Sequence, residues 1–173
     1  MGLGVLLALT GCSSIRATAD YDRTASFGSL HTYAWRTAPQ QGPGDPRLDN
    51  SLLDARVKHA VDRELEAKGY RKVSPEERAD FLVGYHVVLQ RKVDVQTVGT
   101  WYGYRGAGLR IPETRTYQYE QGTLLLDVVD PTTTNLIWRG TATAVVDPDV
   151  STEKRERRIA EAVAKVLADF PPR

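Results

Sequence analysis

The chain has 173 residues, with 23 Lys and Arg against 22 Asp and Glu, so its formal net charge is +1. This balance argues against a nucleic-acid-binding protein, in which basic residues are normally in excess. The chain is of single-domain size, and its one cysteine cannot form a disulfide within the chain.

A short apolar run, residues 3–8, leads into Leu9-Thr10-Gly11-Cys12 and then into the polar pair Ser13-Ser14. An apolar segment followed by small residues and a polar break is typical of a secretory signal, and a cysteine at this position is typical of a bacterial lipobox. We therefore expect residues 1–11 to be a cleaved signal peptide and Cys12 to carry acyl chains that bind a membrane. No Lys or Arg precedes the apolar run, so we expect the start of the signal to be truncated or misassigned.

The apolar run is too short to cross a bilayer, which takes about 20 apolar residues. Ser13, the residue after the cysteine, resembles the residue choice of lipoproteins sorted to the outer membrane. We therefore expect a lipid-anchored protein of the bacterial cell envelope that faces the periplasm from the outer membrane.

We expect residues 12–26 to comprise the lipidated cysteine, a tether and a first strand, and residues 27–173 to form the rest of the same domain. A second short strand is predicted at residues 32–35. The Pro- and Gly-rich residues 39–46 are predicted to form a loop. Apolar residues at helical spacing then predict a helix over residues 48–68.

Alternating apolar residues predict further strands, which lie at residues 70–73, 81–95, 115–120, 123–130 and 136–146. A final apolar stripe predicts a helix from about residue 151 to residue 170. Small residues at Gly140, Ala142 and Ala144 are expected to let a helix approach the last strand closely. This order of elements favours an α+β fold with a single antiparallel or mixed sheet and two main helices packed on one face.

Residues 97–112 are rich in glycine and aromatic residues and are predicted to form a loop. Aromatic and arginine side chains are enriched at interface hot spots, and loops often carry function. The binding candidates are Trp101, Tyr102, Tyr104, Arg105 and Arg110. We expect this loop to contact a partner protein, a glycan or a lipid headgroup; the alternative is a hairpin tip whose aromatic side chains pack back on the sheet.

The sequence contains no convincing catalytic or metal-binding arrangement. The histidines belong to no metal-ligand motif; they are His31, His59 and His86. Closely spaced carboxylates occur at Asp20 and Asp22 and at Asp127 and Asp130, where turn-forming and solubilising roles are favoured over acid–base catalysis. Neither a nucleophile elbow nor a phosphate loop is present. We therefore predict no catalytic residue, no metal site and no cofactor.

Further segments complete the pattern that the lipobox begins. They are Asp20-Tyr21-Asp22, Phe27-Gly28-Ser29-Leu30-His31-Thr32-Tyr33-Ala34-Trp35, Leu65-Glu66-Ala67-Lys68-Gly69-Tyr70, Ala79-Asp80-Phe81-Leu82-Val83-Gly84-Tyr85, and Asp127 with Leu136-Ile137-Trp138-Arg139-Gly140. Together they resemble the bacterial lipoproteins grouped as domain of unknown function 4136. The resemblance implies a membrane-anchored, periplasm-facing α+β domain with no established activity and no catalytic residues to carry over.

The sequence thus favours a non-catalytic envelope lipoprotein that acts as a binding or scaffolding module, with an envelope protein or a glycan as partner and no nucleic acid. The alternative is a periplasmic enzyme or small-ligand carrier with a polar pocket that contains Asp20, Asp22 or His86. Convergence of at least two of these side chains in one pocket would favour the alternative.

Overall fold

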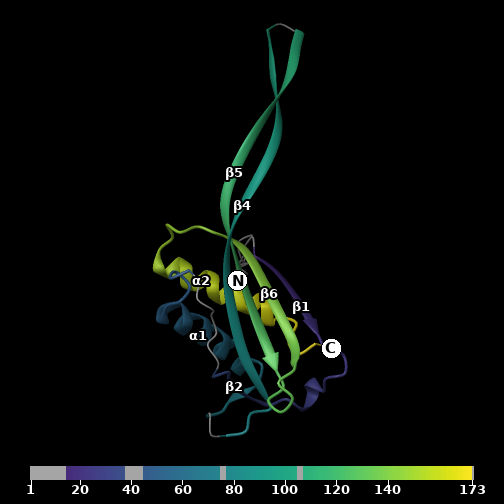
Figure 1. Cartoon of the computed structure of the whole chain (residues 1–173), viewed down its shortest axis with the longest axis vertical. Coiled ribbons are helices and arrows are strands. Elements are labelled where there is room, and N and C mark those ends of the chain that lie inside the picture. Colours follow the sequence, from purple (N-terminus) through teal and green to yellow (C-terminus); the bar gives the residue numbers. More distant parts are fainter. Residues whose placement is uncertain (1–14, 38–44, 75–76, 105–106, 173) are drawn as a thin grey trace, which may run out of the picture.

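The protein is a six-stranded sheet with two helices on one face, and a long hairpin projects from one end of this body (Figure 1). The computed structural model describes residues 15–37, 45–74, 77–104 and 107–172, with the backbone alone at 100–104 and 107–111. The predicted α+β fold with one mixed sheet is confirmed. Residues 1–11 and Cys12, the predicted signal peptide and lipidation site, lie outside the described residues.

The strands are β1 (Arg16–Tyr21), β2 (Thr32–Trp35), β3 (Arg71–Lys72), β4 (Phe81–Tyr104), β5 (Ala107–Val129) and β6 (Leu136–Val146), and a 3₁₀ turn at Phe27–Ser29 precedes β2. Their order across the sheet is β1-β6-β5-β4-β2-β3. Pairing is antiparallel from β1 across to β4, whereas β2 is parallel to both β3 and β4. Parallel neighbours need a crossover connection, which α1 (Ser51–Ala67) provides between β2 and β3.

Each helix begins at a polar capping residue. The side chain of Asn50 accepts a hydrogen bond from the Leu53 amide of α1 at 2.9 Å. Ser151 Oγ accepts one from the Lys154 amide of α2 (Thr152–Leu167) at 3.3 Å. Such caps satisfy amides that have no partner inside the helix. No helix in the described parts of the chain is long and apolar enough to cross a membrane.

The two helices lie side by side and run in the same direction. Near their starts, Arg56 of α1 pairs with Glu156 of α2 at 3.1 Å. Beyond their ends, the rings of Tyr70 and Phe170 lie 5.5 Å apart. Figure 1 shows both helices on the same side of the sheet.

Aromatic side chains fill the core at the end of the body where both helices finish. The ring of Phe170 lies 5.8 Å from that of Phe81 and 5.1 Å from that of Trp138. Tyr33 stacks on Phe81 at 5.8 Å, and all four of these side chains are less than 2% exposed. Burial of large apolar surface is the main favourable term in folding, so this cluster stabilises the contact between helices and sheet.

Gly140 of β6 lies where α2 packs closest to the sheet. A Cβ atom at this position would clash with Cγ1 of Val166 on α2 and with the ring of Trp138. The predicted close approach of a helix to the small residues of this strand is therefore confirmed at Gly140.

The predicted loop at residues 97–112 is wrong, because residues 97–104 belong to β4 and residues 107–112 belong to β5. Backbone pairing continues from Thr97↔Thr114 to Tyr104↔Ala107. The strands predicted at residues 115–120 and 123–130 are also one strand, which continues through Gln121 and Gly122. Glycines normally weaken a strand, but here the two long strands keep one register along their whole length.

Asp80 joins the start of β4 to β2. Its Oδ2 atom accepts hydrogen bonds from the backbone amides of His31 at 2.9 Å and Thr32 at 2.8 Å, and from Thr32 Oγ1 at 2.9 Å. These donors favour the ionised carboxylate and hold the pKa of Asp80 below its ordinary value of 3.8. The carboxylate thus fixes the parallel pairing at this edge of the sheet.

Replacing Gly140 with Ala is expected to lower the free energy of unfolding by about 1–3 kcal/mol, because the added methyl group forces α2 or Trp138 to move. Urea denaturation measures the change. Gly28→Ala is the matched control, since nothing lies within 4 Å of a Cβ at that position. Equal stability of the two variants would contradict the close packing of α2 on β6.

Asp80→Ala is expected to lower the unfolding free energy by about 1–2 kcal/mol near neutral pH, because the three donors lose a charged acceptor. Because the pKa of Asp80 is lower in the folded state, its ionised carboxylate stabilises the protein fully above pH 3.8, the unfolded-state pKa. This stabilisation is lost as the pH falls through the folded-state pKa. Urea titrations at about pH 6 and about pH 3 should therefore show a smaller difference between wild type and variant at the lower pH. An equal difference at both pH values would rule out this role for the carboxylate.

Candidate functional site

The β4–β5 hairpin is the most prominent surface feature of the molecule. β6 pairs with β5 as far as Glu120↔Val146, and beyond this level the pairs run from Lys92↔Tyr119 to Tyr104↔Ala107. Within the part of the chain that the structure describes, these outer residues pair only with each other. At about 3.3 Å per residue, this outer ribbon reaches about 40 Å beyond the body (Figure 1).

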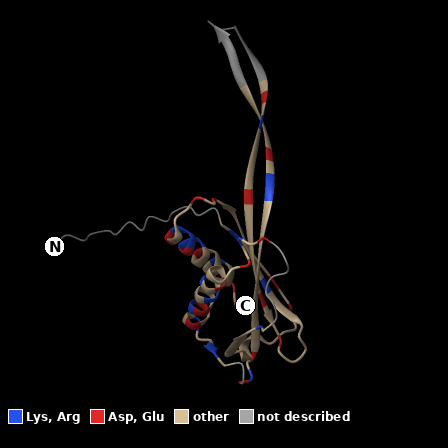
Figure 2. Cartoon of the chain, turned by 60° about the vertical axis from the view of Figure 1, so that its left-hand side comes forward, with Lys and Arg blue, Asp and Glu red and all other residues tan. Residues whose placement is uncertain are grey.

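Apolar side chains of the ribbon face solvent. Directly paired residues point to the same side of a ribbon, and positions two apart along a strand share that side. On one side lie Tyr117, 48% exposed, and Tyr119, 38% exposed, and on the other side lie Val93, 61% exposed, and Val95, 60% exposed. Charged residues of both signs are scattered along the ribbon and over the helices (Figure 2), so the exposed apolar side chains stand between charged ones.

The predicted binding residues belong to the outer part of this hairpin. The backbone of Trp101 pairs with Arg110 and that of Tyr102 with Leu109, and Tyr104 pairs with Ala107 at the end of the ladder. The side chains of these residues lie outside the described part of the structure, as does the whole of Arg105. The register brings Trp101 and Arg110 opposite each other, which the sequence could not show.

The residues of the alternative polar pocket do not come together. Asp20 of β1 is level with Gly84 of β4, and two strands lie between them, so His86 is more than about 14 Å from Asp20. Asp22 accepts hydrogen bonds from the Thr24 amide at 2.8 Å and from the Thr24 hydroxyl at 2.7 Å, which is a local turn.

All three of these alternative residues are exposed. His86 is exposed on β4. Among the described residues, no group of three or more His, Cys, Asp or Glu side chains is placed to hold a metal ion.

The other predicted carboxylate pair has structural roles. Asp127 is 3% exposed and makes a two-bond ion pair with Arg139 of the neighbouring strand, at 2.6 and 2.7 Å. Asp130 accepts hydrogen bonds from the amides of Thr132 and Thr133 at 2.8 and 2.7 Å and forms the turn before β6. These carboxylates stabilise the β5–β6 hairpin and do not face one another across a cavity.

A largely apolar groove lies between the first halves of both helices and the sheet. Its volume is about 530 Å³. Its floor comes from β4, β5 and β6, and is formed by Val87, Leu89, Leu124, Ala142, Ala144 and Val146. Leu53 and Val57 of α1 form one wall, and Ile159 and Ala162 of α2 form the other. The groove therefore opens at the end of the body from which the hairpin projects.

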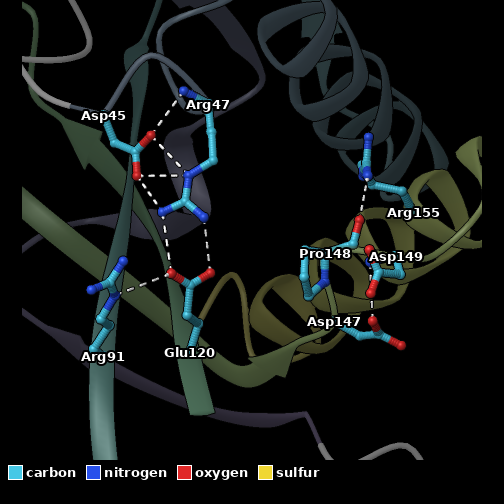
Figure 3. A network of polar contacts seen from close by, with 8 residues as sticks. All are labelled: Asp45, Arg47, Arg91, Glu120, Asp147, Pro148, Asp149 and Arg155. Atoms are coloured by element: carbon cyan, nitrogen blue, oxygen red, sulfur yellow. Dashed lines mark hydrogen bonds and ion pairs between the residues drawn. The ribbon is translucent and has the colours of Figure 1, made fainter. Parts of the chain in front are cut away.

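An ion-pair network holds the segment before α1 against the base of the hairpin (Figure 3). Arg47 contacts both Asp45, at 2.5 Å, and Glu120 of β5, at 2.9 Å, and Arg91 of β4 lies 3.9 Å from Glu120. Hydrogen bonds from the Arg47 side chain and amide lower the pKa of Asp45 to about 2. This network borders the mouth of the groove, where Arg47 and Glu120 form part of the lining.

Sequence reasoning missed the groove. The small residues of β6 are its signal in the sequence, but their pattern predicts close helix packing. That reading holds at Gly140, but Ala142 and Ala144 lie along the groove floor. Which small positions a helix covers depends on the tilt of the helix over the sheet, and spacing alone does not give this tilt.

Residues 17–172 match the protein family described as "Domain of unknown function (DUF4136)". The chain belongs to this family. The match covers the whole body and the hairpin, and it confirms the resemblance that the sequence segments indicated. No curated protein matches this DUF4136 chain.

Two solved structures resemble this DUF4136 protein in fold. A PDZ domain protein from Parabacteroides distasonis ATCC 8503 is 14% identical, with a TM-score of 0.57, and the match covers 92% of this chain and 35% of that one. This chain therefore spans about a third of the length of that protein. The PelC dodecamer from Paraburkholderia phytofirmans is 13% identical, with a TM-score of 0.51, and the match covers 92% of this chain and 99% of PelC. At these identities the likeness shows the fold alone.

Proposed function

We propose that this protein is a non-catalytic binding module of the bacterial envelope, anchored through acyl chains on Cys12, that engages a partner protein through the β4–β5 hairpin. The observation that carries the proposal is the ribbon itself, which continues about 40 Å past the last residue pair of β5 and β6 and exposes apolar side chains.

A two-stranded ribbon that is surrounded by water gains little stability from its own contacts. An isolated hairpin is marginally stable, and its outer backbone groups are open to pairing with another chain. The described part of this ribbon exposes Val93, Val95, Tyr117 and Tyr119. Further out, its sequence contains Trp101, Tyr102 and Tyr104, of types that are enriched at interface hot spots. A bound protein would cover these side chains and would supply partners for the free strand edges.

The position of β1 bears on the anchor. Arg16 pairs with Thr143, near the end of β6 that adjoins the hairpin base, and β1 runs away from that end. β1 therefore begins at the end of the body from which the hairpin projects. With an acylated Cys12, the hairpin points toward the membrane and the expected partner lies at or near the bilayer surface.

The descriptions of the two similar solved structures support a protein that acts as a module of larger assemblies. In one, the shared fold is about a third of a longer PDZ domain protein, and the other is described as a dodecamer. Applied to this chain, these descriptions favour a scaffold or recruiting role over an enzyme. The alternative catalytic pocket lacks support, since Asp20 and His86 lie on strands that two others separate.

The combined variant Trp101→Ser, Tyr102→Ser and Tyr104→Ser is expected to abolish capture of the partner, because it removes the outermost aromatic side chains of the hairpin. A photo-crosslinking residue at Val95, which is 60% exposed, followed by mass spectrometry of intact cells, identifies the captured protein. The melting curve should be unchanged, because the ribbon lies outside the core.

The controls use the body of the molecule. A crosslinker at Thr18 of β1 and the variant Tyr21→Ser, which removes a 39% exposed aromatic side chain from that strand, should leave capture unaltered. Capture that survives the triple variant, or crosslinks to glycan alone, would reject the proposed protein partner.

Replacing Cys12 with Ser is expected to release the protein from the membrane fraction, because acyl chains on this thiol provide the attachment. Mass spectrometry of the natively expressed wild type should show a chain that begins at Cys12 and carries fatty acyl groups. Ser13→Ala is the matched control and should remain membrane-bound. A wild-type chain that keeps its first eleven residues and no lipid would disprove the anchor while leaving the hairpin test intact.

A further inference from the structure

We propose that the groove between the helices and the sheet binds an anionic amphiphile with a single acyl chain. The acyl chain lies on the apolar floor, and the acidic headgroup lies at Arg155 and Arg158 of α2. This site is separate from the ribbon that we assign to partner binding.

The dimensions and walls of the groove fit an apolar chain. Its volume of about 530 Å³ falls within the range of about 300–1,000 Å³ that is typical of small-molecule sites. Aliphatic side chains form its floor, including Val87, Leu89 and Leu124. A hydrocarbon chain gains the most from such a surface because no polar group of its own is stripped of water.

Small side chains keep the groove open. The aromatic cluster around Phe81 and Phe170 fills the other end of the layer between helices and sheet. At the groove, Ala142 and Ala144 take the corresponding places on β6, and they leave the space between the helices and the sheet unfilled.

Apolar surface is also exposed at the groove. Leu52 of α1 is 64% exposed and lines the groove. Exposed apolar surface beside a cavity is typical of a site that a ligand covers.

The charges of the lining favour an anionic headgroup. Four arginines line the groove against two carboxylates, Glu120 and Asp147. Two of the four arginines have acidic partners, since Arg47 pairs with Glu120 and Arg56 with Glu156.

The other two guanidinium groups contact backbone oxygens. Arg155 donates to the carbonyl oxygen of Pro148 at 3.4 Å, and Arg158 donates to that of Val145 at 2.6 Å. Among the described residues, neither forms an ion pair with a carboxylate, so both keep a net charge for the ligand. Guanidinium groups bind carboxylate and phosphate oxygens alike.

The source of such a ligand is close if the proposed anchor holds. Ile15 lines the groove, and its carbonyl oxygen accepts a hydrogen bond from Lys165 of α2 at 3.3 Å. Cys12 is three residues away along the chain, a reach of at most about 11 Å. The groove then lies next to the lipid surface, and single-chain lipids or fatty acids can enter it without crossing much water.

Displacement of a fluorescent fatty acid, cis-parinaric acid, tests the site in the full chain. Every variant carries Cys12→Ser so that no attached acyl chain competes. Saturable binding is expected, and Ala144→Phe should weaken it about tenfold or more by filling the groove. Thr141→Phe is the matched control, since Thr141 points to the opposite face of the sheet, and it should bind like the parent chain. Ala162→Leu narrows the groove from α2 and serves if Ala144→Phe fails to fold.

Competition by three amphiphiles tests the headgroup. Palmitate and a lysophosphatidic acid should both displace the probe, and their relative strength distinguishes a fatty-acid source from a phospholipid source. The double variant Arg155→Gln and Arg158→Gln should weaken displacement by palmitate and by the lysophosphatidic acid severalfold. Displacement by hexadecanol, which carries no charge, should be unchanged. Absence of saturable binding, or binding that ignores both groove variants, would overturn the proposal, and equal loss for hexadecanol would overturn the role of the two arginines.

Discussion

The size of the side chains on the helix-facing side of β6 is the constraint on which the rest of the structure depends. At Gly140 there is no room for a Cβ, so α2 packs directly against the strand and against Trp138. Around Trp138, the rings of Phe170 and Phe81 complete a dense core. Toward the other end of β6, Ala142 and Ala144 take the place of such rings, and the same two helices enclose a groove.

The segments that carry the family resemblance correspond to contacts that hold this arrangement. Arg139 neutralises the buried Asp127 in a two-bond pair, which keeps β5 and β6 in register. Trp138 and Gly140 alternate with Arg139 along β6 and face the helices, so one short segment serves both faces of the sheet. Asp80 accepts hydrogen bonds from the amides of His31 and Thr32 at the start of β2, and Phe81 next to it enters the core. The resemblance therefore reflects the demands of the fold and assigns no chemistry.

Periodicity predicted the body well, because each of its elements buries one face. The alternation that begins at Phe81 and the helical stripe through Val57 and Leu65 both match buried positions. The ribbon could not be predicted in this way, since the described side chains of its strands face solvent on both sides and Gly99, Gly103 and Gly108 are typical of a loop. The groove could not be predicted from the sequence either, because it depends on residues of three strands and two helices that come together only in the fold.

The hairpin is continuous with the sheet of the body. Its strands are uninterrupted continuations of β4 and β5, which are the two central strands of the sheet. Backbone hydrogen bonds in an antiparallel sheet lie across the strand axis. A pull on the tip along the ribbon axis therefore shears all the bonds that hold β5 to β6 at once and does not peel them one after another. A load applied to the hairpin would therefore pass directly into the two central strands of the sheet.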